Sequence, residues 1–164
     1  MKIFIMRHGE ANQFGASDAQ RALTQRGEAE VATMSKWLAL QCEHFDKVIV
    51  SPFKRAQQTA NIVIKNIKIS EDEIRNNQLT TDIITPSGDV KVVHDFIDGL
   101  LESDNKIKTL LFVSHMPLVS YLVEELTIDG VMPIFQTAAV SEIDYDVVKM
   151  KGRLLQQVSP HDLP

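Results

Sequence analysis

Three short apolar runs constrain the fold of this 164-residue chain more than any other feature of its sequence. They occupy Lys2–Met6, Lys47–Ser51 and Thr109–Ser114, and each consists mainly of consecutive apolar residues. A strand that is covered on both faces has this continuous pattern, whereas a strand with one face in water alternates apolar and polar residues. The three runs therefore predict parallel strands inside a sheet that is covered on both sides.

Helical patterns lie between these runs. Thr24 predicts the N-cap of a helix over 25–41, in which apolar residues recur at helical spacing. Similar stripes predict helices over 53–66, 89–103 and 117–126. Strands that alternate with helices indicate an α/β domain: a three-layer sandwich with a mostly parallel sheet and helices on both faces.

The remaining segments carry weaker signals. Two stretches, 137–146 and 153–158, predict one or two late strands, antiparallel at the sheet edge. Residues 68–89 show no clear period, and "ITPSGD" within them is typical of a loop that leads into a helix. We expect a single domain over residues 1–158 and a poorly ordered C-terminal tail over 159–164.

Composition sets expectations for compartment and partners. The net charge of −5 gives no general reason to expect nucleic-acid binding. No apolar run approaches the ~20 residues that span a bilayer, and "IFIM" is too short for a secretory signal. The single Cys42 cannot form an internal disulfide, which favours a reducing compartment. We therefore expect a cytoplasmic monomer that binds neither nucleic acid nor membrane.

Basic or imidazole residues follow each of the three predicted strands. Arg7 and His8 end the first, Arg55 lies shortly after the second, and His115 follows the third. Ligands of open α/β sheets bind beyond the carboxyl ends of the strands. We therefore expect these four side chains to converge on one pocket.

The segment "SPFKRAQQTA" has the chemistry of an anion site. Ser51 suits an N-cap, and Pro52 suits the first helical position. A helix N-terminus attracts anions, and the guanidinium of Arg55 can lean back over it and bind phosphate oxygens in pairs. "SHMP" repeats the pattern, with His115 just before Pro117, which can open a helix.

Each histidine also has a less specific interpretation. None of His44, His94 and His161 follows a predicted strand, and a structural or surface role is favoured for them. A metal site is the main alternative for His8 and His115. The sequence has no H-x-H, no H-E-x-x-H and no cysteine cluster, so we expect neither a metal nor another cofactor.

Three motifs, taken in order, resemble the histidine phosphatase (phosphoglycerate-mutase-like) superfamily. They are Arg-His-Gly after the first strand, Ser-Pro-x-x-Arg-Ala-x-Gln-Thr-Ala after the second, and Ser-His-x-Pro after the third. The short length, "SDAQRALTQRG" after the first motif and "TPSGDV" before the third helix are similar to the bacterial SixA-type phosphohistidine phosphatases.

The resemblance implies a role for each motif residue. His8 is expected to be the nucleophile and to become phosphorylated during turnover. Arg7 and Arg55 are expected to hold the phosphoryl oxygens, and His115 is expected to contact the same group as the second histidine. A neutral imidazole has a nucleophilic lone pair, and two arginines with two histidines can bind and stabilise a phosphoryl group without a metal.

Other residues have less defined expectations. Gly9 is expected to let the backbone turn closely beside the phosphate. Arg21 is expected at the pocket rim, with an ordinary surface charge as the alternative. Larger superfamily members usually insert a lid, with a carboxylic proton donor, between the second and third motifs. Here a helix and a strand already occupy much of that stretch, so we expect an open site. Glu10, Asp18 and Asp82 are the candidate proton donors.

The preferred hypothesis is a phosphohistidine protein phosphatase. Its partner would be a phosphohistidine-bearing protein, such as a carrier or a histidine phosphotransfer domain. The first alternative is a small-molecule phosphomonoesterase or mutase of the same superfamily, which predicts a lid and a proton donor. The second is a non-catalytic phosphate-binding module, which the presence of His8 disfavours.

Overall fold

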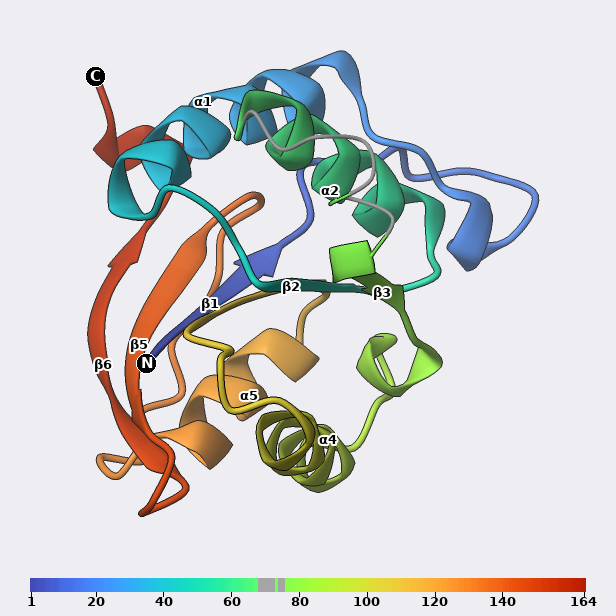
Figure 1. Ribbon diagram of the computed structural model, residues 1–164. Helices are drawn as coiled ribbons and strands as arrows, with labels where there is room; N and C mark the ends of the chain where they lie inside the picture. The colour runs from blue at the N-terminus through green and yellow to red at the C-terminus, as the bar shows by residue number, and fades with distance from the viewer. Residues whose placement is uncertain (68–72, 74–75) are drawn as a thin grey trace.

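A mixed sheet forms the middle layer of the computed structural model, which describes residues 1–67, 73 and 76–164 (Figure 1). Its strands are β1 (Lys2–Arg7), β2 (Lys47–Val50), β3 (Gln78–Thr80), β4 (Thr109–Ser114), β5 (Val140–Asp146) and β6 (Lys151–Val158). In the described residues their order across the sheet is β3-β2-β4-β1-β5-β6. The first four strands are parallel, whereas β5 pairs antiparallel with both β1 and β6.

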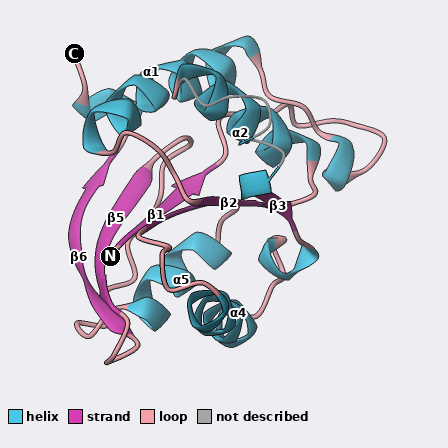
Figure 2. Ribbon diagram, viewed as in Figure 1, coloured by secondary structure: helices cyan, strands magenta, loops and turns pink. Residues whose placement is uncertain are grey.

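Helices cover both faces of this sheet (Figure 2). Those of the described residues are α1 (Gln25–Gln41) and α2 (Lys54–Asn66) on one face, with α4 (Val90–Ser103) and α5 (Leu118–Leu126) on the other. The hydroxyl of Thr24 accepts a hydrogen bond from the N–H of Gly27 at 3.0 Å and caps α1 as predicted. The predicted three-layer α/β sandwich is confirmed, and none of the described helices could cross a bilayer.

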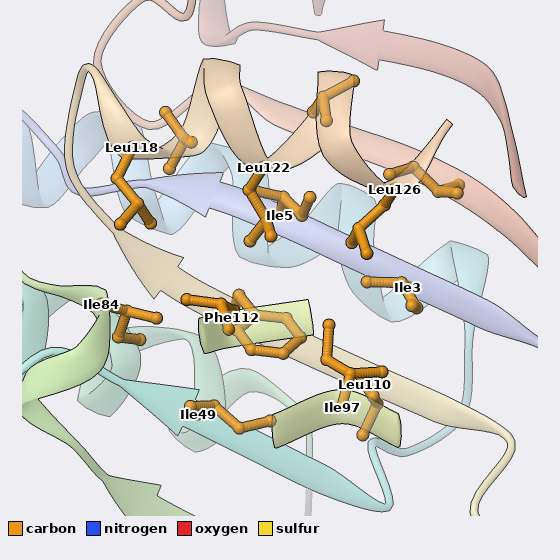
Figure 3. Packing of buried hydrophobic residues seen from close by; sticks show 14 of the residues in the cluster. Ile3, Ile5, Ile49, Ile84, Ile97, Leu110, Phe112, Leu118, Leu122 and Leu126 are labelled. Carbon is orange, nitrogen blue, oxygen red and sulfur yellow. The ribbon is translucent and has the colours of Figure 1, made fainter. Parts of the chain in front are cut away.

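Two apolar clusters explain why the strand sequences are continuously apolar. Ile3 and Ile5 of β1 point into the cluster under α4 and α5, which also contains Phe112 (Figure 3). Phe4 and Met6 point to the opposite face and pack under α1 and α2. Successive residues of a strand face opposite sides, so a strand with two covered faces needs an apolar residue at every position.

Two predicted helix starts need correction. The helix α2 begins at Lys54 with Phe53 as its N-cap, so Ser51 and Pro52 both lie outside it. The Ser51 hydroxyl instead lies 2.7 Å from Nε2 of His115, in the loop that leads to the helix. Similarly, Pro117 is the N-cap of α5, and the helix itself begins at Leu118.

The last residues are ordered, so the expectation of a poorly ordered tail is wrong. Pro160–Asp162 form a short 3₁₀ helix in which the Asp162 carboxylate accepts hydrogen bonds from the N–H and the hydroxyl of Ser159. Leu163 then packs against the apolar cluster under α1 and α2. Ser159, Pro160 and Asp162 are a helix-start signal in the sequence, and the short length of the segment concealed it.

The described part of the stretch 68–89 contains one strand that the sequence did not predict. The edge strand β3 has only three residues and lacks a continuous apolar run, which explains why no pattern marked it. A 3₁₀ turn over Asp82–Ile84 then leads to α4, as expected for a loop before a helix. The predicted irregularity of residues 68–72, 74 and 75 lies outside the described residues.

The two predicted late strands are confirmed as β5 and β6, an antiparallel pair at the sheet edge opposite β3.

Candidate active site

The carboxyl ends of β1, β2 and β4 lie side by side at the same end of the sheet, and the predicted site residues gather there. Arg7 is the last residue of β1 and lies opposite Ser114, the last residue of β4. The N–H of His8 donates to the carbonyl of Ser114 at 3.0 Å, so the backbone after β1 is fixed against β4. Arg55 lies in the first turn of α2, directly after β2.

The hydrogen bonds of His8 define which ring nitrogen carries the lone pair. Nδ1 lies 2.7 Å from the carbonyl oxygen of Gly9, which can only accept, so Nδ1 carries the proton. Nε2 lies 3.1 Å from Nε of Arg55, which can only donate. Nε2 of His8 is therefore the nitrogen with the lone pair, and it accepts a hydrogen bond from the guanidinium of Arg55.

Burial keeps both site histidines neutral. Burial lowers the pKa of His8 to about 4, against the hydrogen bond to Gly9 and with help from the charges of Arg55 and Arg7. Burial likewise lowers the pKa of His115 to about 3, and His8 and Arg55 add to the effect. The two ring centroids lie 5.1 Å apart. At neutral pH the site therefore contains two uncharged imidazoles beside arginine charges.

Arg55 is held on several sides. Besides its bond to His8, its Nη1 donates to the carbonyl of Asp18 at 2.6 Å and its Nη2 to the Asp18 carboxylate at 3.2 Å. The guanidinium also lies over the ring of Phe53, 5.2 Å from its centroid. The side chain is only 4% exposed. The planar fork is consequently fixed before any anion arrives.

Two buried polar atoms have no hydrogen-bond partner within the described residues. They are Nε of Arg7 and Nδ1 of His115. Arg7 is anchored through Nη1, which donates to the carbonyl of Phe135 at 2.8 Å, and His115 through the Ser51 hydroxyl. Leaving a buried donor unmatched costs about 1–3 kcal/mol. Both unmatched atoms belong to residues that the sequence motifs predicted for the site.

Asp18 links the predicted rim residue Arg21 to the pocket. Nη1 of Arg21 donates to the Asp18 carboxylate at 2.8 Å, while the other carboxylate oxygen accepts from Arg55. The bonds from Arg21 and Arg55 hold the pKa of Asp18 below its ordinary value. Nε of Arg21 also donates to the carbonyl of Asn12 at 2.6 Å. Arg21 therefore lies at the rim and contacts the pocket through Asp18.

The other two candidate acids lie in different surroundings. Glu10 accepts from the Thr24 hydroxyl at 2.9 Å and lies 3.6 Å from Arg26, at the start of α1. Asp82 is exposed at the start of the 3₁₀ turn that follows β3. Neither of these two carboxylates contacts a site histidine in the described structure.

The need for a glycine at position 9 has a cause that the sequence did not predict. A Cβ atom there would lie 2.5 Å from the carbonyl oxygen of Gly27 and 2.8 Å from a methyl group of Val31, so the close neighbour is α1. The N–H of Gly9 donates to the Thr59 hydroxyl at 3.2 Å. Gly9 therefore permits close packing of α1 against the loop after β1.

The described residues between α2 and β4 form no inserted lid, but the reactive side chains of the site are themselves buried. His8 is 7% exposed, and Arg55 and His115 are 4% and 1% exposed. Between α2 and β4 the described residues supply β3, the 3₁₀ turn and α4, which all belong to the sandwich. The reactive groups therefore lie below the surface, and a phosphoryl group has to enter to reach them.

Several contacting groups could not be recognised from the sequence. The carbonyl of Phe135, the ring of Phe53 and the hydroxyl of Thr59 each hold a site residue in place. Phe135 is distant from Arg7 in the sequence, and a backbone carbonyl carries no sequence signal. Thr59 belongs to the Ser-Pro-x-x-Arg motif, which was the only available indication.

Comparison with known proteins agrees with this geometry. The model of the histidine phosphatase superfamily (branch 1) matches residues 3–76. The chain is 36% identical to phosphohistidine phosphatase SixA of Escherichia coli K12, over 99% of this chain and 96% of that protein. It is 34% identical to the SixA homolog of Haemophilus influenzae, over 98% and 97% of the two chains.

A solved structure extends the similarity to three dimensions. The structure of the protein histidine phosphatase SixA complexed with tungstate superposes with a TM-score of 0.89 at 35% identity, and 99% of each chain is covered. The similarity spans the whole sandwich, including β5 and β6 and the motifs at the ends of β1, β2 and β4. The chain therefore belongs to the SixA family of the histidine phosphatase superfamily.

Proposed function

We propose that this chain is a phosphohistidine protein phosphatase that acts through a phosphohistidine intermediate of its own. His8 is the nucleophile, Arg7 and Arg55 bind the phosphoryl oxygens, and His115 contacts the same group. The observation that carries the proposal is the neutral His8 ring, whose Nε2 lone pair faces a fixed arginine fork. The names of the two SixA relatives support the same substrate class.

The first chemical step transfers the phosphoryl group. The lone pair on Nε2 of His8 attacks phosphorus, and the bond from phosphorus to the substrate imidazole breaks. The leaving imidazole takes a proton from water, so it departs without an acid on the protein. Arg7 and Arg55 stabilise the charge on the transferred group, which is the main requirement of phosphoryl transfer.

The second step regenerates the enzyme. Water attacks phosphorus on phosphorylated His8, the phosphorus–nitrogen bond breaks, and inorganic phosphate leaves with the added oxygen. Nε2 recovers its lone pair, and Nδ1 keeps its hydrogen bond to the carbonyl of Gly9 throughout. His115 supplies a buried imidazole beside the group in both steps.

The carboxylates support phosphohistidine over an alkyl ester as substrate. An alkoxide leaving group requires a placed acid, which typically contributes ~10²–10⁴-fold. The bonds from Arg21 and Arg55 keep Asp18 ionised at neutral pH, so it has no proton to give.

The partner would be a phosphohistidine-bearing carrier or phosphotransfer domain. The monomeric state, the cytoplasmic location and a catalytic domain ending at residue 158 remain predictions.

Rapid quenching with a labelled substrate tests the proposal. The substrate is a histidine phosphotransfer domain labelled on its phosphohistidine, and the matched comparison is an alkyl phosphate at the same pH. We expect label on His8 after an alkaline quench, and its loss in acid, because a phosphoramidate is stable in base and labile in acid. His8→Ala should abolish turnover, whereas phosphate binding should persist because both arginines remain.

Two results would contradict the proposal. Wild-type rates from His8→Ala, in a preparation free of other phosphatases, would exclude His8 as the nucleophile. Equal kcat/KM for the alkyl ester and the phosphorylated domain would indicate a hidden proton donor. In that case a small-molecule phosphomonoesterase would replace the phosphohistidine protein phosphatase as the preferred hypothesis.

A further inference from the structure

An apolar groove of about 120 Å³ lies next to the candidate active site. Its lining residues are Met116, Pro117, Ser120, Tyr121, Met132 and Ile134. Ile134 is 82% exposed, Met132 51% and Tyr121 46%, although all three are large and apolar. Exposed apolar side chains that gather in one place mark interaction surfaces more often than scattered ones do.

Two lining residues of the groove are direct chain neighbours of residues in the candidate active site. Met116 directly follows His115, and Tyr121 lies in the first turn of α5. On the other side, Ile134 directly precedes Phe135, whose carbonyl anchors Arg7. One lining residue of the groove therefore adjoins the second histidine, and another adjoins the residue that anchors Arg7.

The wall of the groove is fixed to α5. The Ser120 hydroxyl donates to the carbonyl of Pro133 at 2.6 Å and also lies 3.1 Å from the sulfur of Met116. This polar group of the groove is consequently already used within the protein. What remains for an occupant is apolar surface held in a defined shape.

We propose that this groove docks the protein that carries the phosphohistidine, by receiving an apolar side chain that lies beside the phosphohistidine on the carrier's surface. The inference rests on the proposed function. A phosphohistidine on a folded domain reaches His8 only if the surrounding carrier surface covers the rim of the pocket. Met116 and Ile134 tie the groove to His115 and Phe135 beside that rim, and its volume of about 120 Å³ suits one aliphatic side chain.

Other occupants fit the chemistry less well. A free phosphorylated amino acid carries charged ammonium and carboxylate groups, which gain nothing from an apolar wall. A second copy of this chain seated on the groove would cover the entrance to the pocket and exclude the substrate. The carrier is the occupant for which covering the groove and filling the pocket are the same event.

Ile134→Ser tests the groove, with Val148→Ser as its matched control. Val148 is 87% exposed and lies in the turn after β5. Because β5 runs antiparallel to β1, this turn lies near the start of β1, at the end of the strands opposite the candidate active site. Each variant is assayed with a phosphorylated histidine phosphotransfer domain and with phosphoramidate, a small phosphorus–nitrogen substrate. We expect Ile134→Ser to lower kcat/KM for the domain about tenfold, mainly through KM, and to leave phosphoramidate hydrolysis unchanged. Val148→Ser should change neither.

The remaining outcomes overturn the inference. If Ile134→Ser affects both substrates equally, or neither, the groove does not dock the carrier. If sedimentation shows a wild-type dimer that Ile134→Ser dissociates while both activities persist, the groove is an interface between copies of this chain. If the wild-type protein hydrolyses neither substrate, the proposed function itself fails, and that result is distinct from a selective change in the variant.

Discussion

At the scale of single residues, the site depends on one carboxylate that holds two cations. Asp18 accepts from Arg21 with one oxygen and from Arg55 with the other, and its carbonyl accepts from Arg55 as well. Arg55 in turn presents Nε to the reactive nitrogen of His8. Asp18 therefore acts on the reaction through Arg55, as a positioning residue.

Asp18→Asn separates this role from that of a proton donor. An amide offers one acceptor where two N–H groups now bind, so the variant loses one charge-assisted bond. We expect kcat/KM to fall about tenfold for phosphohistidine and alkyl phosphate alike, since a bond to a charged group contributes about 1.5–3 kcal/mol. The acid limb of the pH profile should stay where it is.

The control for this variant is Asp146→Asn, which removes an exposed carboxylate from the last residue of β5, at the end of the strands opposite the candidate active site. It should leave all rates unchanged. A selective loss of ~10²–10⁴-fold on the alkyl ester, with the phosphohistidine rate preserved, would instead identify Asp18 as the general acid.

The sequence predicted the position of the site better than its internal contacts. Arg7 and His115 could be placed because each directly follows an apolar run, and Arg55 because it lies shortly after one. The carboxyl ends of parallel strands lie at the same end of the sheet, where ligands bind. The proton position on His8 could not be predicted, since it depends on the Gly9 carbonyl and on Arg55. The pairing of Asp18 was equally hidden, because its partners come from two other segments.

At the scale of elements, the contact between α1 and the loop after β1 limits the structure most tightly. A Cβ atom on Gly27 would lie 2.0 Å from the carbonyl oxygen of Glu10, and one on Gly9 would meet the carbonyl of Gly27. Both obstacles are backbone atoms, so α1 itself would have to move. The loop that it contacts carries His8.

Gly27→Ala and Gly99→Ala form a matched pair within helices. Alanine normally stabilises a helix by about 0.8–1 kcal/mol relative to glycine. Gly99 lies in α4 with nothing within 4 Å of its added Cβ, so Gly99→Ala should raise the melting temperature. Gly27→Ala should lower the stability by about 1–3 kcal/mol through overpacking, and lower kcat through the displaced loop. Thermal melts of both variants check this, and a stabilised Gly27→Ala would contradict the close contact.

The sequence predicted these elements unequally for a physical reason. Long apolar runs and capped helices carry their own signals, so β4 and α1 have the bounds that were predicted. The edge strand β3 is three residues long and is held by pairing with β2, which leaves no local pattern. The start of α2 moved because Ser51, a good N-cap by type, is turned toward His115.

At the scale of the whole molecule, the buried neutral histidines couple folding to pH. His8 and His115 have folded pKa values of about 4 and about 3, whereas an unfolded histidine titrates near ~6.5. Below about pH 6.5, these two histidines bind protons in the unfolded chain but stay neutral in the folded chain. The stabilisation from these two groups is therefore complete above about pH 7 and is lost as the pH falls from ~6.5 toward the folded values.

His115→Gln measures the contribution of one of these groups. For the wild-type chain we expect the free energy of unfolding to fall between pH 7 and pH 5, by on the order of 1–2 kcal/mol per buried histidine. In the variant the fall should be smaller by one such contribution, because glutamine does not titrate. Urea titrations at the two pH values give the difference, and subtracting the variant's change removes the other titrating groups. Asp18 and Asp46, whose pKa values are lowered, remain ionised in both states above pH 5 and so do not disturb the window. An equal fall in both proteins would mean that His115 accepts a proton without unfolding, and the neutral second histidine would then have to be abandoned.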